Sequence, residues 1–222
     1  MSLKQLSLCF GLLILLAAPR MAPAGDVVVY DNTGVHTSGG YATDGVWAFN
    51  VFEAYGYMGD QVTLSVSDAT ISRFDLMLYS TEAATAEGVQ VALFPIDTTT
   101  FEIGAPYWTS DPRNVEVGAD EVTVVTFDVP DVAVPQELVW AAAGDSDVAG
   151  LATMDPPSVG SSASTYYWNK APEPEGWIPL NLGSEMAANF GARIWAVPEP
   201  TGLVVLLSGC AGLIARRRRR TA

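Results

Sequence analysis

Short runs of alternating apolar and polar residues, separated by turn-forming residues, fill most of this chain between residues 25 and 197. In the run SRFDLMLYS, Phe74, Leu76 and Leu78 share one face of an extended strand, and Arg73 and Asp75 share the other. Alternation of this kind is typical of half-buried antiparallel strands. The middle of the chain is therefore predicted to be built from β-strands.

Similar runs recur along the whole body. In the run QVTLSV, Val62, Leu64 and Val66 fall on one face. Further strands are predicted at 27–30, 46–52, 89–94, 121–129, 137–143 and 190–197, and long loops or irregular edge strands at 95–118 and 165–183. No segment of the body keeps the apolar period of a helix. The pattern predicts an all-β fold, an antiparallel two-sheet sandwich of jelly-roll type.

The first 24 residues have the pattern of a secretory signal peptide. Lys4 precedes an apolar run at 6–18, and the small residues Ala22 and Ala24 precede Gly25. A basic start, a short apolar core and an A-x-A site are the three parts of such a peptide. Cleavage after Ala24 is predicted, which makes Gly25 the first mature residue. The alternative is an uncleaved N-terminal anchor helix.

The stretch 197–222 has a different three-part pattern. The residues Val197, Pro198, Glu199 and Pro200 precede an apolar run at 203–215. Five consecutive arginines follow the run: Arg216, Arg217, Arg218, Arg219 and Arg220. A helix over the apolar run would be about 20 Å long, which is short for a hydrocarbon core of about 30 Å. Because a dense basic cluster stays in the cytoplasm, the pattern predicts a short transmembrane helix that holds the exported body transiently.

This tail resembles the PEP-CTERM sorting signal of Gram-negative bacteria. In that family a membrane protease, exosortase, reads a Pro-Glu-Pro motif, an apolar helix and a basic cluster, and the resemblance implies the same for this chain. A second Pro-Glu-Pro copy, at 172–174, has neither the apolar run nor the arginines. The body also resembles, in runs such as VVYDNTG and NFGARIWAVPEP, a secreted β-domain found before such tails. The alternative is a plain single-pass tail anchor.

The body carries a strong negative charge. Residues 25–197 contain 24 acidic residues and four basic ones, namely Arg73, Arg113, Lys170 and Arg193. Such a surface repels phosphate groups, which excludes nucleic acid as a partner. Both cysteines lie in the terminal segments. Residues 25–196 are therefore predicted to form one domain that is stabilised by burial without a disulfide.

Few residues of the body could support catalysis. His36 is the single histidine of the chain, and there is no G-x-S-x-G motif, so a serine hydrolase is not predicted. One histidine without cysteine cannot supply three or four zinc ligands. A glycosidase needs two carboxylates at a suitable separation, but no pair stands out among the acids. We predict that the protein is not an enzyme, and a glycoside hydrolase ranks last among the alternatives.

Two acidic turns offer oxygen ligands of the kind that calcium takes. The first contains Asp26, Asp31 and Asn32, and the second contains Asp145 and Asp147. Neither has the spacing of an EF-hand, and solvated acidic turns are the preferred interpretation. We expect no cofactor and leave Ca²⁺ as the alternative.

Four aromatic residues lie in or beside one irregular stretch: Tyr166, Tyr167, Trp168 and Trp177. Exposed aromatic rings stack on sugars, which would make this stretch a carbohydrate-binding site. The preferred alternative is that these large rings belong to the core, where they bury much area.

Both ends of the chain indicate an exported, non-enzymatic protein of the cell surface or extracellular matrix. Its expected partners are signal peptidase and an exosortase-type protease during processing, with extracellular polysaccharide as a further candidate partner. It is expected to cross the inner membrane and to remain membrane-anchored until its tail is processed. The alternative function is that of a carbohydrate-binding module.

Overall fold

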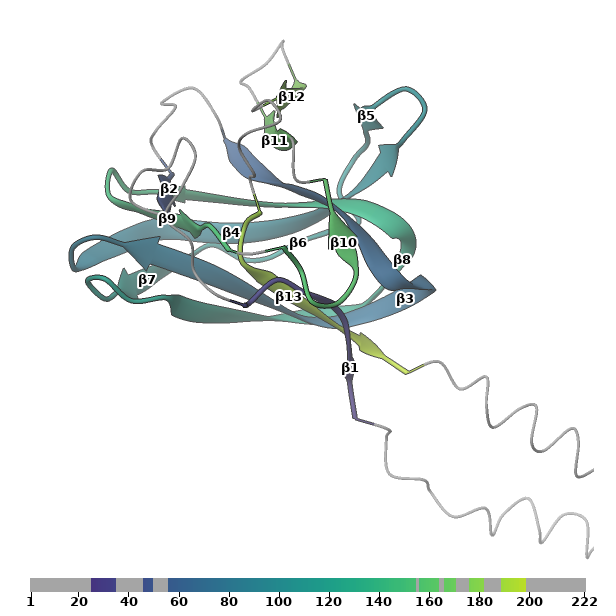
Figure 1. The fold of residues 1–222 in the computed structure, drawn as a ribbon, viewed down its shortest axis with the longest axis horizontal. Coiled ribbons are helices and arrows are strands. Elements are labelled where there is room, and N and C mark those ends of the chain that lie inside the picture. The colour runs from purple at the N-terminus through teal and green to yellow at the C-terminus, as the bar shows by residue number, and fades with distance from the viewer. Residues whose placement is uncertain are drawn as a thin grey trace, which may run out of the picture.

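The computed structural model describes residues 25–34, 46–49, 56–154, 156–163, 166–170, 176–181 and 189–198. These residues form thirteen strands in one large antiparallel sheet, without a helix among them (Figure 1). The prediction of an all-β body is confirmed. In the described ranges, no helix is long and apolar enough to cross a membrane.

Three long strands form the frame of the sheet: β3 (Tyr57–Ser80), β4 (Ala84–Asp97) and β8 (Thr123–Asp145). The others are short: β1 (Val27–Asp31), β2 (Val46–Ala48), β5 (Glu102–Ile103), β6 (Trp108–Thr109), β7 (Arg113–Val117), β9 (Ala149–Ala152), β10 (Ser161–Ser162), β11 (Tyr166–Lys170), β12 (Trp177–Asn181) and β13 (Ala192–Val197). The strand order is β1-β13-β3-β8-β4-β5. Of the remaining strands, β9, β10 and β11 pair with β3, β6 and β7 pair with β4, β2 pairs with β9, and β12 pairs with β11.

Strands β3 and β8 are longer than the sequence pattern predicted. The runs 61–66 and 72–80 belong to one strand, and so do the runs 121–129 and 137–143. The residues between the runs stay extended because they also pair, Asp68–Ile71 with Val132–Pro135. The register shifts between Thr63 and Asp68 and again between Ile71 and Arg73. Such irregularities bend a strand without ending it.

The main core combines residues from both halves of β3 and of β8. The first half of β3 pairs with the second half of β8, and the second half of β3 pairs with the first half of β8. Phe74 lies in the second half of β3, opposite the first half of β8, whereas Trp140 lies in the second half of β8, opposite the first half of β3. The centroids of their rings are 5.4 Å apart. Both side chains are fully buried. The buried face predicted for Phe74, Leu76 and Leu78 is confirmed.

One predicted core position is wrong. Val62 and Leu64 are buried, but Val66 is 39% exposed. Val66 lies in the stretch of β3 where the register with β8 shifts, between Thr63 and Asp68. Because the strand bends there, the alternation that placed Val66 inward no longer applies.

A smaller core covers the other face of the sheet. It consists of Ala92, Phe94, Val139, Ala141 and Trp168. Trp168 comes from the β11–β12 hairpin, whose strands lie inside the segment 165–183 that was predicted as a loop or irregular edge strands. Strand β11 joins the edge of β3, with Trp168 opposite Gly59.

Gly59 is placed where only a residue without a side chain fits. A Cβ atom there would collide with the carbonyl oxygen of Trp140 and the Cα of Ala141, which are both backbone atoms of β8. We expect Gly59→Ala to lower the free energy of unfolding by at least about 2 kcal/mol, because a paired strand cannot move aside. Urea denaturation measures this change. Gly56→Ala is the matched control, since no atom lies within 4 Å of a Cβ at Gly56; equal effects at the two glycines would contradict the prediction.

Candidate functional site

An open groove of about 960 Å³ lies between two projecting hairpins. One wall is the turn that joins β4 to β5, and the other is the β11–β12 hairpin; both stand at the top of Figure 1. The residues that line the groove include Ile96, Asp97, Phe101, Glu102, Ile103, Lys170 and Trp177. The lining therefore combines aromatic, aliphatic and charged side chains, as small-molecule and polymer sites commonly do.

Phe101 lies at the tip of the first wall in an unusual conformation. Its φ is +57°, in the left-handed region that bulky residues rarely adopt. Asp97 fixes the turn: its Oδ1 accepts the backbone N–H of Thr99 at 2.8 Å and that of Thr100 at 3.2 Å, and its carbonyl oxygen accepts the N–H of Phe101 at 2.7 Å. Even so, 50% of Phe101 is exposed. The turn thus presents a large aromatic ring to solvent on a rigid support.

Trp177 and Lys170 form the opposite wall as cross-strand partners in the β11–β12 hairpin. The Trp177 ring packs edge to face against Phe94, with 4.8 Å between centroids. The Lys170 amino group lies 5.9 Å from the centre of the Tyr57 ring. Trp177 is therefore half-buried: one part of the ring belongs to the small core and another part lines the groove.

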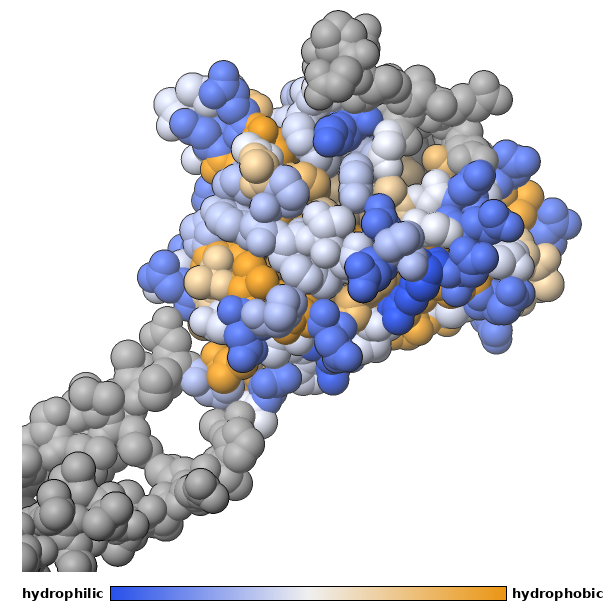
Figure 2. Space-filling view, turned by 180° about the vertical axis from the view of Figure 1, so that it is seen from behind, coloured by the Kyte–Doolittle hydropathy of each residue, from blue (hydrophilic) through white to orange (hydrophobic). Residues whose placement is uncertain are grey.

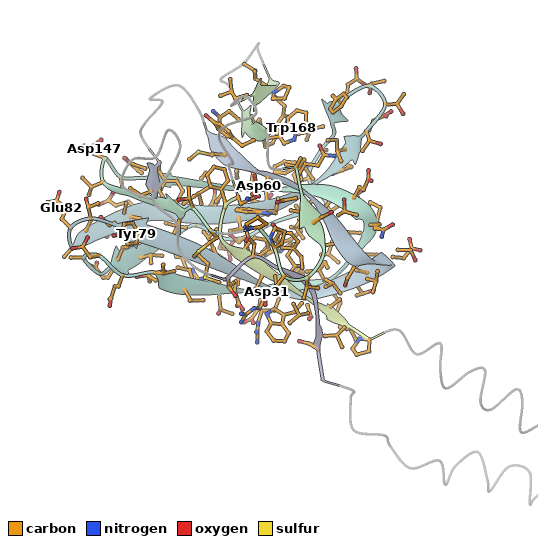
Figure 3. The ribbon with its side chains drawn as sticks, viewed as in Figure 1. Asp31, Asp60, Tyr79, Glu82, Asp147 and Trp168 are labelled. Atoms are coloured by element: carbon orange, nitrogen blue, oxygen red, sulfur yellow. The ribbon has the colours of Figure 1, made fainter. Side chains whose placement is uncertain are left out.

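The four aromatic residues that the sequence suggested for sugar binding lie in different environments in the structure. Trp168 (Figure 3) is fully buried and Tyr167 is 1% exposed, so both are core residues. Tyr166 belongs to β11, but its side chain lies outside the described residues. Trp177 lines the groove, and so does Phe101, a residue that sequence reasoning missed. No local signal marked Phe101, because its exposure depends on the turn conformation.

The groove has charged groups of both signs. Asp97 and Glu102 are cross-strand partners in the β4–β5 hairpin, and Lys170 lies across from them. The backbone hydrogen bonds from Thr99 and Thr100 lower the pKa of Asp97, so this carboxylate is ionised at neutral pH. Carboxylates accept hydrogen bonds and the ammonium group donates them. The groove can therefore bind a partner rich in hydroxyl groups.

A second polar feature lies inside the main core. Asp60 is fully buried, and its Oδ2 accepts the backbone N–H of Phe190 at 2.8 Å (Figure 3). The side-chain amide of Asn32 donates to the carbonyl oxygen of Phe190 at 2.9 Å. The hydroxyl of Ser162 donates to Oδ1 of Asn189 at 2.7 Å. These strand ends are thus tied together by side-chain hydrogen bonds within an apolar surrounding.

Burial raises the pKa of Asp60 well above its ordinary value, although the hydrogen bond from Phe190 acts in the opposite direction. Burial also raises the pKa of Tyr30, with a further contribution from the negative charge of Asp60. Tyr30 is therefore neutral in the folded protein at neutral pH, and Asp60 keeps its proton to a higher pH than an exposed aspartate does. Since no substrate reaches a fully enclosed carboxyl group, Asp60 has a structural role. Its place was visible in the sequence, where it alternates with Met58 and Val62 on the buried face.

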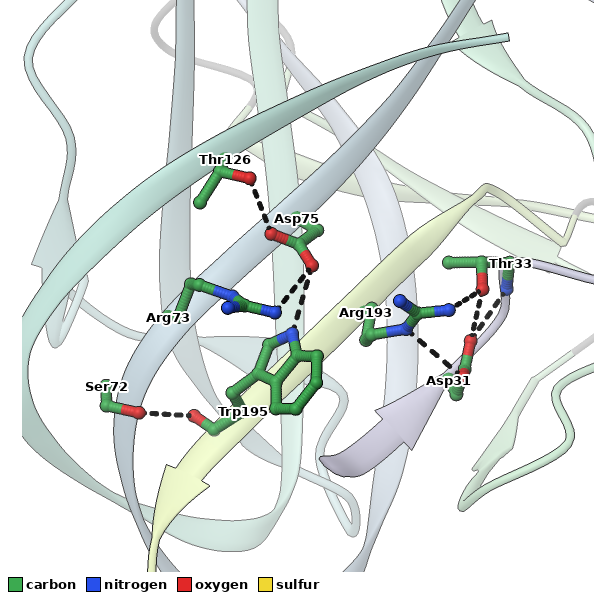
Figure 4. A network of polar contacts seen from close by, with 8 residues as sticks. All are labelled: Asp31, Thr33, Ser72, Arg73, Asp75, Thr126, Arg193 and Trp195. Carbon is green, nitrogen blue, oxygen red and sulfur yellow. Dashed lines mark hydrogen bonds and ion pairs between the residues drawn. The ribbon is translucent and has the colours of Figure 1, made fainter. Parts of the chain in front are cut away.

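Of the calcium candidates in the first acidic turn, Asp31 is engaged through both oxygens: Oδ1 accepts the N–H and hydroxyl of Thr33, and Oδ2 pairs with Arg193 at 3.2 Å (Figure 4). Asn32 is buried, whereas Asp26 is exposed. Asp145 and Asp147 in the second turn are exposed. In the described part of the chain, no group of three or more His, Cys, Asp or Glu is arranged to hold a metal ion.

A neighbouring polar network occupies the outer face of the same sheet. Asp75 accepts hydrogen bonds from Thr126 at 2.8 Å and from the Trp195 indole at 3.0 Å, and it pairs with Arg73 at 3.3 Å (Figure 4). The Arg73 guanidinium also lies 3.9 Å from the centre of the Trp195 ring. This network links β13 to β3 and β8. It also engages the Arg73 guanidinium, which is therefore not available to bind an anionic ligand.

The described body ends at the start of the expected sorting signal. Val197 is the last residue of β13 and is 37% exposed, and Pro198 follows it. With Val27 and Val66 they line an apolar hollow of about 270 Å³, and Figure 2 shows apolar atoms beside the place where the chain leaves the body. Gly25 is exposed. The other residues of the expected signals, and His36, lie outside the described residues: Ala22, Ala24, Glu199, Pro200, Arg216, Arg217, Arg218, Arg219 and Arg220.

Comparisons with protein-family models, with curated proteins and with solved structures found no significant match.

The raised pKa of Asp60 leads to a pH prediction. Above its ordinary pKa of about 4, the unfolded chain releases the proton that the folded chain keeps, so stability falls as pH rises. We expect Asp60→Asn to remove this contribution, up to about 1.4 kcal/mol per pH unit, because an amide keeps the neutral form at every pH. Urea denaturation between pH 4 and pH 7 measures the slopes. Asp111→Asn, at an exposed position, is the matched control; a slope for the Asp60 variant equal to that of the control would refute the assignment.

Proposed function

We propose that this protein is an exported, non-enzymatic component of the cell surface or extracellular matrix, sorted through a C-terminal signal of PEP-CTERM type. Signal peptidase would remove residues 1–24, and an exosortase-type protease would process the tail. The observation that carries the proposal is the order of three features after the body: the Pro-Glu-Pro motif at 198–200, the apolar run at 203–215 and the five arginines.

The internal Pro-Glu-Pro copy supports this interpretation by contrast. Residues 172–174 have the same three amino acids, but Glu175, Gly176 and Trp177 follow them. Trp177 begins strand β12 and packs against Phe94. A protease that reads the motif together with an apolar helix and a basic cluster would therefore act at the terminal copy alone.

The arrangement of the chain ends also supports the proposal. β1 and β13 are antiparallel neighbours, with Val27 opposite Ala196. The chain therefore enters and leaves the body at the same end (Figure 1). Among the described residues, the buried core lies upstream of Val197. Processing beyond Val197 would leave this core intact.

The proposal includes a finer description of the fold. We assign the body to the jelly-roll type of sandwich, with its two layers formed by the two halves of β3 and β8. The mutual burial of Phe74 and Trp140 between these halves supports it. The proposal also includes an N-terminal signal helix and a short C-terminal transmembrane helix, in segments outside the described residues.

The two Pro-Glu-Pro copies provide a test with an internal control. We expect replacement of Pro198, Glu199 and Pro200 by alanine to block tail processing and to leave the protein in the membrane fraction. The same replacement at 172–174 should leave processing unchanged. Intact-mass analysis of the protein from its native cells reports both cleavage sites. Equal effects at the two copies would show that the context of the motif carries no signal.

The arginines are expected to keep the C-terminus in the cytoplasm while processing occurs. Moving an arginine into the hydrocarbon costs roughly 2.5–3.5 kcal/mol on insertion scales. The short apolar run alone retains the tail weakly. We expect replacement of Arg216–Arg220 by glutamine to release precursor with its complete tail into the medium, as measured by mass. Normal processing and localisation of this variant would remove the retention role.

A further inference from the structure

The groove between the β4–β5 turn and the β11–β12 hairpin has a binding role beyond sorting. We propose that it binds a neutral polysaccharide, with Phe101 and Trp177 in contact with sugar rings and Asp97, Glu102 and Lys170 bonded to hydroxyl groups. This site differs from the carbohydrate site that the sequence suggested, which consisted of Tyr166, Tyr167, Trp168 and Trp177. The proposed site retains Trp177 and adds residues of the β4–β5 turn on the opposite side of the groove.

The state of Phe101 is the first argument. A half-exposed phenylalanine with a φ of +57° combines two unfavourable features, exposed apolar area and backbone strain. In the described ranges, the other non-glycine residues with positive φ are Asp120 and Asp131, and aspartate tolerates this region better. A ligand that covers the ring would supply the contacts that the free protein lacks.

The rigidity of the groove is the second argument. Ile96, Ile103 and Trp177 are partly buried against the small core of Phe94 and Trp168. The turn above them is fixed by the hydrogen bonds of Asp97. A preformed surface loses little conformational freedom on binding, which favours a weakly interacting ligand such as a sugar chain.

Charge decides between classes of polysaccharide. The body has 24 acidic and four basic residues, and the groove itself contains Asp97 and Glu102 against Lys170. Arg73 and Arg193 are paired on the outer face of the sheet, and Arg113 lies 3.9 Å from the Phe127 ring. An acidic polymer would be repelled by this surface, whereas the hydroxyl groups of a neutral one can bond the carboxylates and the amine. The open shape suits a chain that continues beyond the groove.

The experiment uses full-length protein in detergent and three variants. Phe101→Asn removes the ring, and asparagine tolerates the left-handed backbone of the turn. Trp177→Leu removes the wide ring and keeps an apolar contact with Phe94. Tyr107→Asn is the matched control, because Tyr107 is an aromatic residue, 39% exposed, outside the groove lining. Urea denaturation of each variant measures its folding separately from its binding.

Affinity electrophoresis measures binding to dextran, a galactan and a mixed-linkage β-glucan as neutral polymers, to alginate as an acidic one, and to β-casein as an unfolded protein chain. We expect at least one neutral polymer to bind, at least tenfold weaker binding for Phe101→Asn and Trp177→Leu, and unchanged binding for Tyr107→Asn. The unfolding midpoint of Phe101→Asn should equal or exceed that of the wild type. Failure of every neutral polymer to bind, preference for alginate or β-casein, or unchanged binding of both groove variants would overturn the proposal. None of these outcomes bears on tail processing, so the sorting proposal stands or falls separately.

Discussion

The antiparallel pairing of β3 with β8 is the constraint on which the rest of the structure depends. Each strand runs through both halves of the body, so one ladder of hydrogen bonds holds both halves. Five strands pair directly with it: β13, β9, β10 and β11 along β3, and β4 along β8. The other six described strands pair with one of these five. A residue that disturbs this ladder affects both halves at once, which is why the missing side chain of Gly59 matters more than its small size suggests.

The ladder also explains the buried carboxyl group. Asp60 lies opposite Trp140 on the inward face of β3, where the apolar halves meet. An ionised carboxylate would be costly there, and burial accordingly raises the pKa of Asp60. Its carboxyl group accepts the backbone N–H of Phe190, which lies two residues before the start of β13. A single polar group thus ties the segment that leads into β13 to the centre of the sheet, at the cost of stability that declines as pH rises.

The sequence pattern predicted the fold class and much of the core, since alternation along a strand directly reflects which face is buried. It placed Phe74, Leu76 and Leu78 correctly and failed at Val66, where a register shift turns the strand. It also divided each long strand in two, because turn-forming residues such as Asp68 and Pro135 occur inside them. The groove was only partly predictable. The exposure of Phe101 depends on the conformation of its turn, and the opposite wall of the groove comes from a hairpin that is distant in sequence. Neither feature leaves a local pattern in the sequence.

The positions of the groove and of the chain ends relate the two proposals to each other. The hairpins that form the groove stand at one side of the body, and the segments that leave β1 and β13 do so at another (Figure 1). A body held through the chain beyond Val197 would therefore present the groove away from its point of attachment. The charge distribution also separates the body from its point of attachment. Net acidity keeps the body away from anionic surfaces, while in the proposed sorting scheme the five arginines near the end of the chain would hold the tail at the membrane before processing. Under the two proposals together, the body would meet a neutral polymer outside the cell while its tail is still attached, and binding and processing would not compete for the same surface.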